Sequence, residues 1–345
     1  MALAAWTTVR KWFNDNADSY LLASLEEGEP LKPYQSYLRV WLAQMFLAKR
    51  VSWLQTYFPA VHAEVKLPFG TEPAMSFARV VRPADEKLGE GVLLNYPLTE
   101  LLPYNGGVVE IDAALFGLKG DDSLRAGVVL LEQFSSLIAP PLGQVLAIAD
   151  KIAVGARDFL DRAGGGVHLV LHQVLTSAGG GGANVMRSGY LVVVLARAGQ
   201  VPAAELRVDG DQLYRGAAPF TSHDFILLRI EARDQRDNWY SPAVEEARGK
   251  AIDALLNGDK EAAQRYRGAA LASVLRSHDF TEADKRRIAV AINREWDELA
   301  GYGLGISGEA PPADLPSLVD RYPMSQAAAA ALGPVTMEEA MAGRW

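Results

Sequence analysis

Alternating apolar and polar positions in the middle of the chain predict a set of β-strands. From Val61 to Leu67 and from Ser76 to Arg82 apolar residues take every second position, which is the period of a strand with one solvated face. After the turn at Asn105-Gly106-Gly107, apolar residues from Val109 to Leu115 again share one face. Further strands are predicted from similar patterns at 92–96, 167–175 and 225–232.

Two further signals indicate how these strands are arranged. The run from Tyr190 to Ala196 is apolar on both faces, so we expect it in the middle of a sheet. Asp209-Gly210 lies between the apolar pairs Leu206/Val208 and Leu213/Tyr214, which is typical of a tight hairpin. We therefore expect antiparallel sheets.

Helical spacing of apolar residues prevails before and after the strands. Aromatic and aliphatic residues follow a helical period from Leu3 to Phe13 and from Tyr34 to Phe58, which predicts N-terminal helices within residues 1–60. Three helical segments are predicted over residues 242–301, with Asn257-Gly258 between the first two and Thr281 at the start of the third.

A helical hairpin is predicted as an insert in the strand-rich region, over residues 121–161. Asp121 or Asp122 can cap its first helix, and Pro140-Pro141 ends that helix. The segment from Val128 to Ile148 is nearly apolar, but Glu132 and the proline pair interrupt it, whereas a membrane-spanning helix needs about 20 unbroken apolar residues. We favour a buried hairpin over a membrane span, and a hairpin that unpacks and enters lipid stays as an alternative.

These elements predict an α+β fold with four parts. The strand-rich domain covers residues 61–241 and in outline resembles an antiparallel β-sandwich, such as a C2-like domain, with additions. N-terminal helices precede it, and a helical unit follows it. Residues 302–345 are rich in Gly, Pro and Ala and are expected to form an extended or partly disordered tail, with Trp345 as an apolar anchor. An outline of this kind does not assign a function.

Composition and charge remove several classes of function. The chain has 345 residues, a formal net charge of −8 and no cysteine. Its Lys and Arg residues are scattered, which argues against a nucleic-acid partner. The lack of cysteine excludes disulfides, thiolate nucleophiles and cysteine-bound zinc. The first ten residues have no signal-peptide core, so we expect a cytoplasmic protein, and the Ala, Gly and Arg usage suggests a bacterial source.

Histidine motifs suggest a hydrolase only weakly. Ser-His-Asp-Phe occurs at 222–225 and at 277–280, but consecutive residues of a strand point apart and do not form a triad. His168 and His172 fall on one face of a predicted strand without a HExxH motif or an evident third ligand. A hydrolase that uses His168 or His223 is therefore one alternative.

Acidic loop residues offer weak candidates for a calcium site. Loops at one end of a sandwich can gather carboxylates, and the residues concerned are Asp121, Asp122, Asp209 and Asp211. Asp209 is already explained by its turn, so we assign neither a metal nor any other cofactor.

The sequence favours a non-enzymatic protein that binds other proteins, as an adaptor or a regulated component of a bacterial multi-protein system. No coherent catalytic set is present, whereas Trp and Arg are the residue types that dominate protein interfaces. A membrane-acting protein, either pore-forming or membrane-docking, that uses the 128–148 hairpin is the second alternative. The candidate partner-binding residues are Trp41, Arg233, Arg236, Trp239 and Trp345.

Overall fold

The chain divides into two compact units, which we call the sheet unit and the helical unit. The computed structural model describes residues 20–48, 51–52, 55–69, 72–81, 92–119, 166–178, 184–236, 239, 241–302 and 311–343. The sheet unit takes its described residues from Met1–Leu31, Leu38–Leu102 and Gly106–Ala232. The helical unit comprises Lys32–Tyr37, Pro103–Asn105 and Arg233–Trp345. Two short segments of the N-terminal half thus belong to the helical unit.

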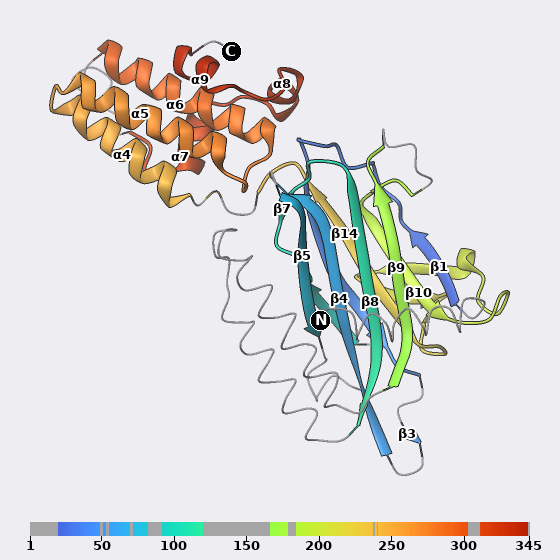
Figure 1. The fold of residues 1–345 in the computed structure, drawn as a ribbon. Helices are drawn as coiled ribbons and strands as arrows, with labels where there is room; N and C mark the ends of the chain where they lie inside the picture. Colours follow the sequence, from blue (N-terminus) through green and yellow to red (C-terminus); the bar gives the residue numbers. More distant parts are fainter. Residues whose placement is uncertain are drawn as a thin grey trace. The chain divides into compact units, whose positions relative to one another are not determined.

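A six-stranded antiparallel sheet forms one layer of the sheet unit (Figure 1). Its strands run in the order β1 (Tyr20–Leu25), β10 (Gly189–Leu195), β14 (Phe225–Arg233), β2 (Tyr37–Phe46) and β6 (Val92–Pro97), and the short β7 (Leu102–Pro103) also pairs with β2. β10 lies between β1 and β14, as predicted for a run that is apolar on both faces. Val192 to Val194 on this strand are fully buried.

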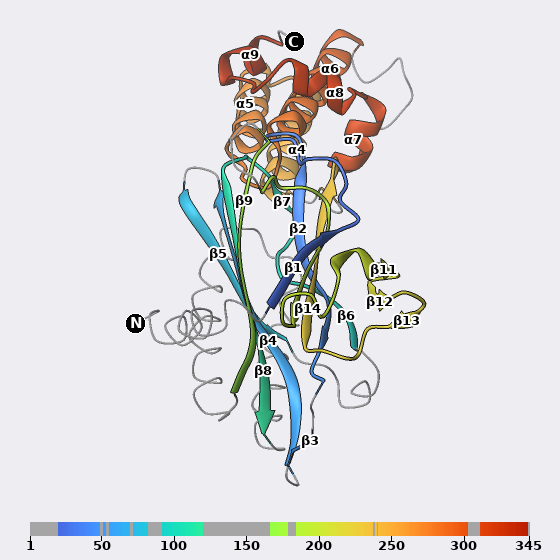
Figure 2. The same ribbon diagram turned by 90° about the vertical axis from the view of Figure 1, so that its right-hand side faces the viewer.

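A five-stranded antiparallel sheet forms the second layer, and Figure 2 shows the two layers edge-on. Its strands are β3 (Val51–Ser52), β4 (Gln55–Phe69), β8 (Val108–Lys119) and β9 (Gly166–Thr176), with β5 (Glu72–Val81) on the other side of β4. Alternation along β4 and β8 puts Val61, Ala63, Val65, Val109 and Ile111 on one face, where all are buried.

A small hairpin covers part of the outer face of the six-stranded sheet. It comprises β11 (Leu206–Asp209), β12 (Gln212–Arg215) and β13 (Ala218–Pro219), and the 3₁₀ helix Ala203–Glu205 precedes it. The hairpin is confirmed, but its central turn residues are Gly210 and Asp211, one residue later than the predicted Asp209-Gly210, and their φ values of 56° and 64° are those of a type I′ turn. Leu206, Val208 and Leu213 pack with residues of β10 and β14 in one apolar cluster.

The helical unit contains three long and three short helices among the residues that the structure describes. They are α4 (Pro242–Leu256), α5 (Lys260–Arg276), α6 (Glu282–Tyr302), α7 (Leu315–Arg321), α8 (Gln326–Ala331) and α9 (Met337–Ala342). The first three confirm the helices expected from the pattern after Pro242. Their core includes Leu271, Ile288 and Ile292 of the long helices together with Leu315 and Leu318 of α7.

The expected extended tail is wrong for residues 311–343. Arg286 on α6 donates to the backbone carbonyls of Leu332, Gly333 and Pro334 at 2.9–3.2 Å, and Asn293 donates to that of Ala340 at 2.9 Å. The segment also packs Leu315, Leu318 and Val335 into the core of the helical unit. Its Gly, Pro and Ala content alone suggests disorder, because composition does not show these long-range contacts.

The expected N-terminal helix over 34–58 is also wrong, because this stretch forms β2, β3 and the start of β4. Its apolar residues fit a helical period, but Leu38, Val40 and Leu42 also alternate, and all three are buried. Pairing with neighbouring strands far along the chain overrides the local pattern. The helix predicted at Leu3 to Phe13 and the insert over 121–161 lie outside the described residues.

Candidate functional site

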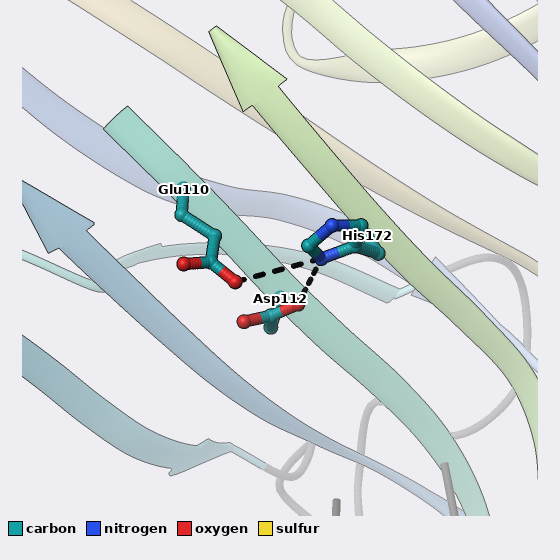
Figure 3. A group of neighbouring side chains, drawn as sticks. All are labelled: Glu110, Asp112 and His172. Atoms are coloured by element: carbon teal, nitrogen blue, oxygen red, sulfur yellow. Dashed lines mark hydrogen bonds and ion pairs between the residues drawn. The ribbon is translucent and has the colours of Figure 1, made fainter. Parts of the chain in front are cut away.

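Charged side chains gather on one face of the five-stranded sheet, on three adjacent strands. Glu64 on β4 lies opposite Asp112 on β8, and Asp112 lies opposite His172 on β9. Lys66 and Glu110 form the next pair between β4 and β8, on the same face. We call these five residues the charged cluster, and Figure 3 shows three of them.

Asp112 is the centre of the charged cluster. Its Oδ1 lies 2.7 Å from Nδ1 of His172, and its Oδ2 lies 3.3 Å from Nζ of Lys66. Oε1 of Glu110 lies 3.7 Å from each of those two nitrogens. Both carboxylates of β8 therefore contact the same lysine and the same histidine.

Three carboxylates surround a single ammonium group in the charged cluster. Oε2 of Glu64 lies 3.8 Å from Nζ of Lys66, so this lysine contacts Glu64, Glu110 and Asp112. Burial alone would lower the pKa of Lys66, but the carboxylates of Glu64, Asp112 and Glu110 together raise it. The three carboxylates and Lys66 together carry two more negative than positive charges.

The ligand atoms of Glu110, Asp112 and His172 lie within 4.8 Å of one another. The Asp112 side chain is only 8% exposed, whereas that of His172 is 49% exposed, so the group opens to solvent on one side. Imidazole and carboxylate together suit divalent ions of the first transition row. Among the described residues, these three are the group that could hold a metal ion.

His168 and His172 do not act as a pair, because each contacts a different aspartate. In the pairing of β8 with β9, Leu115 lies opposite Leu169, and the next residue, Phe116, lies opposite Val167. His168 therefore has no opposite residue on β8 and forms a β-bulge. Nδ1 of His168 lies 3.2 Å from Oδ2 of Asp224, while Oδ1 of Asp224 accepts from the backbone N–H of Ala48 at 2.6 Å.

The described contacts of the histidines give no catalytic triad. Asp224 bonds to His168, whereas Nδ1 of the adjacent His223 lies 2.8 Å from Oγ of Ser222, and its ring stacks on Phe220. Within the described part of the chain, the hydrogen bonds of His168 include none to a serine or threonine hydroxyl. For a hydrolytic role, the described residues thus give His168 an aspartate partner but no hydrogen-bonded serine or threonine.

Trp41 contacts two guanidinium groups on the outer face of the six-stranded sheet. The guanidinium carbons of Arg39 and Arg229 are 5.1 Å and 4.7 Å from its ring centroid, and its Nε1 donates to Oε2 of Glu231 at 2.7 Å. Arg229 is held in turn by both oxygens of Asp211, at 2.7 Å and 2.9 Å. We call this set the Trp41 cluster, and its members are Arg39, Trp41, Tyr190, Asp211, Arg229 and Glu231.

The Trp41 cluster is preorganised and partly exposed. The hydroxyl of Tyr190 donates to Oδ1 of Asp211 at 2.8 Å, and burial together with this hydrogen bond raises the pKa of Tyr190 to about 12. The side chains of Arg39, Arg229 and Glu231 are 15%, 27% and 22% exposed. An aromatic ring with its neighbours already fixed loses little conformational entropy when it binds a partner.

The other predicted partner-binding residues do not join Trp41. Arg233 is exposed at the end of β14. In the helical unit, Arg236 forms an ion pair with Asp279 at 3.8 Å and lies over Phe280, while Trp239 stacks on Phe280 with Arg287 over its own ring. Both therefore take part in packing within that unit. Trp345 lies outside the described residues.

The hairpin aspartates do not form a carboxylate group for calcium. Asp209 pairs with Arg207 at 3.4 Å, and both oxygens of Asp211 bind Arg229. Asp121 and Asp122 lie outside the described residues.

The sequence alone predicts some, but not all, of the residues that meet in these clusters. Alternation places Glu110 and Asp112 on one strand face, but the register that adds His172 and Lys66 is a long-range property. The partners of Trp41 are missed because the period of its segment predicts a helix. Tyr190, Asp211 and Arg229 come from three separate segments that only the sheet order brings together.

No helix in the described part of the chain is long and apolar enough to cross a membrane. The chain matches no protein-family model, no curated protein and no solved structure.

Proposed function

We propose that this protein works by binding another protein, through the Trp41 cluster. The observation that carries the proposal is the position of Trp41, whose ring contacts the guanidinium groups of both Arg39 and Arg229 on a partly exposed sheet face. Trp, Tyr and Arg are the residues that contribute most to protein interfaces. The cluster contains all three types, fixed in place before a partner arrives.

The surroundings of Trp41 support an interface rather than a purely internal contact. The hairpin β11–β12–β13 packs on the outer face through Leu206, Val208 and Leu213, whereas Arg39 and Trp41 are not part of that apolar cluster. At the edge of the same sheet, Pro97 lies opposite Trp41 and is exposed. A segment of another protein that places an apolar side chain beside Trp41 and polar groups beside the arginines fits this mixed surface.

The described contacts support a protein-binding adaptor more than an enzyme. Among the described residues, the hydrogen bond of His168 goes to Asp224 and none goes to a serine or threonine hydroxyl. The alternative in which the 128–148 hairpin enters lipid concerns residues that the structure does not describe. The sandwich-like and C2-like character of the sheet unit stays part of this proposal and is supported only by its two layers of antiparallel strands.

Affinity capture with matched variants tests the proposal. The chain would be immobilised as wild type, as Trp41→Ala and as a control, Tyr214→Ala, and incubated with a lysate of the source organism. Tyr214 is a suitable control because it also contacts an arginine, Arg207 at 4.5 Å, but is not a member of the Trp41 cluster. Circular dichroism would first show that each variant is folded.

We expect a protein that wild type and Tyr214→Ala retain in stoichiometric amounts and that Trp41→Ala retains at least tenfold less. That ratio corresponds to the loss of one interface residue worth about 1.4 kcal/mol or more. Identical capture by all three chains would remove Trp41 from the interface. Turnover of a small substrate by a chain that captures nothing would overturn the proposal.

A further inference from the structure

The ligand set of Glu110, Asp112 and His172 differs from an ordinary patch of surface acids in its chemistry. It combines one imidazole nitrogen with two carboxylate oxygens, which is a donor set for zinc, manganese or iron rather than for calcium alone. Nδ1 of His172 lies 2.7 Å from Oδ1 of Asp112 and 3.7 Å from Oε1 of Glu110. Ligands that share one ion at about 2.1 Å lie about 3.0–3.4 Å apart, so small side-chain rotations suffice.

The backbone that carries these donors is rigid. Asp112 and His172 are a direct cross-strand pair, and Glu110 precedes Asp112 by two residues on the same face of β8. β8 also pairs with β4 over ten registered positions on its other side. The three side chains converge above a sheet interior rather than on a loop, as Figure 3 shows, and a site on such strands needs little reorganisation.

The local charge favours a cation at this position. Asp112 is held in a buried position where an uncompensated carboxylate is costly, and Glu64 and Glu110 add two further negative charges around a single lysine. A divalent ion would bring the group of five residues to neutrality. The half-exposed ring of His172 leaves room on the solvent side for water molecules to complete the coordination.

We infer that Glu110, Asp112 and His172 bind one divalent transition-metal ion, with zinc or manganese as the fitting chemical class. The ion lies between Nδ1 of His172 and Oδ1 of Asp112, which are 2.7 Å apart without it. Lys66 lies 3.3 Å from the other oxygen of Asp112 and is not a ligand. Its charge competes with the ion for the same carboxylates, so it weakens the site.

Isothermal titration calorimetry with zinc chloride and with manganese chloride tests the inference on the full chain. The variants are His172→Gln and Glu110→Gln, which change exposed or half-exposed side chains, and Lys66→Met. The matched control is His168→Gln, because His168 also pairs with a buried aspartate, Asp224 at 3.2 Å, but has no third ligand among the described residues. Thermal unfolding with and without metal gives a second measure of the same binding.

We expect one ion per chain, at least tenfold weaker binding in His172→Gln and Glu110→Gln, and unchanged binding in His168→Gln. Lys66→Met should bind several-fold more tightly, because a positive charge about 4 Å from the ion is removed. Absence of stoichiometric binding overturns the inference, as does binding that His172→Gln leaves unchanged. Weaker binding in Lys66→Met would show that the lysine supports the site, and would contradict its role as a competitor of the ion.

Discussion

The hydroxyl of Tyr37 donates a 2.6 Å hydrogen bond to Oδ2 of Asp284, although 247 residues separate the two along the chain. The same hydroxyl accepts from the backbone N–H of Thr281 at 3.1 Å, and Arg287 donates to the second oxygen of Asp284 at 2.8 Å. Both Tyr37 and Asp284 are fully buried. Tyr37 thus fixes the first turn of α6 within the helical unit.

Replacement of Tyr37 by phenylalanine should destabilise the protein by about 1–3 kcal/mol, because it leaves a buried carboxylate and a backbone N–H without their partner. Urea denaturation measures the change. Tyr214→Phe is the control, since its hydroxyl bonds to Gln212 within the small hairpin, and it should change stability by less than about 0.5 kcal/mol. Equal midpoints for wild type and Tyr37→Phe would refute the role of this hydroxyl.

The buried ion pair between α4 and α6 gives a second prediction. Nε of Arg248 donates to Glu295 at 2.7 Å, and their side chains are 5% and 4% exposed. Glu295→Ala should cost about 3–5 kcal/mol, because it leaves a buried guanidinium unpaired. The exposed pair Lys250–Glu246 on α4 is the control, and Glu246→Ala should cost less than about 1 kcal/mol.

A double variant shows whether the cost arises from the unpaired charge. Arg248→Met with Glu295→Leu removes both charges, and its stability should be closer to that of wild type than the stability of Glu295→Ala is. If the double variant is less stable than Glu295→Ala, the pair itself, and not the unpaired guanidinium, stabilises the helices. Chemical denaturation of the three chains distinguishes these results.

Gly117 makes room for the ring of His168. A Cβ at this position would lie 2.7 Å from Nε2 of His168 and 3.3 Å from the ring of Tyr57. Gly117→Ala should therefore cost about 1–3 kcal/mol through overpacking. Gly249→Ala on α4 is the control, because nothing lies within 4 Å of its Cβ, and it should instead stabilise the helix by about 0.5–1 kcal/mol.

A double-mutant cycle attributes the cost to the histidine. In a His168→Ala background the clash with Nε2 is gone, so Gly117→Ala should cost clearly less than in wild type. Equal costs in the two backgrounds would mean that Tyr57 or the backbone, and not His168, requires glycine at position 117.

Alkaline pH should weaken the fold through Tyr190. Its pKa is raised to about 12 in the folded protein by burial and by the hydrogen bond to Asp211, whereas a free tyrosine has a pKa of about 10. The unfolded chain therefore loses this proton first, so the stabilising contribution is complete below pH about 10 and is lost as the pH rises towards 12.

Urea denaturation at pH 9 and pH 11 measures this contribution by comparison of wild type with Tyr190→Phe. The loss of stability between the two pH values should be smaller in the variant, which has no proton to lose at that position. An equal loss in both chains would show that other groups account for the alkaline behaviour.

Local patterns predict most of the strands after residue 60 and the three long C-terminal helices, because their buried residues recur at the correct period, whereas β1 is missed. Val61 to Leu67 alternates cleanly and lies within β4, and the Asp209-Gly210 hairpin follows from local turn chemistry. Residues 34–58 show the limit of such patterns. The spacing of Leu38, Trp41 and Met45 fits a helix. The stretch forms the strand β2 because it pairs with strands that are remote in the sequence.

The two clusters could not be derived from the sequence, since each depends on strand order. Glu64, Asp112 and His172 are a row across three strands, yet nothing local aligns them. The ordered structure of the C-terminal segment, residues 311–343, could not be predicted for a different reason. Its order comes partly from donors such as Arg286 and Asn293 on α6, which bind its backbone carbonyls, and partly from its own Leu315, Leu318 and Val335, which pack in the helical core.

Photo-cross-linking beside Trp41 tests the central proposal most directly. A benzophenone amino acid would replace Pro97, which is exposed and lies opposite Trp41 on β6, or Ala217, which is exposed between β12 and β13. Irradiation in the source organism should give one defined protein adduct from position 97 and none from position 217, and Trp41→Ala should abolish it. Adducts of equal yield from both positions, or an adduct from position 97 that survives Trp41→Ala, would contradict an interface at the Trp41 cluster.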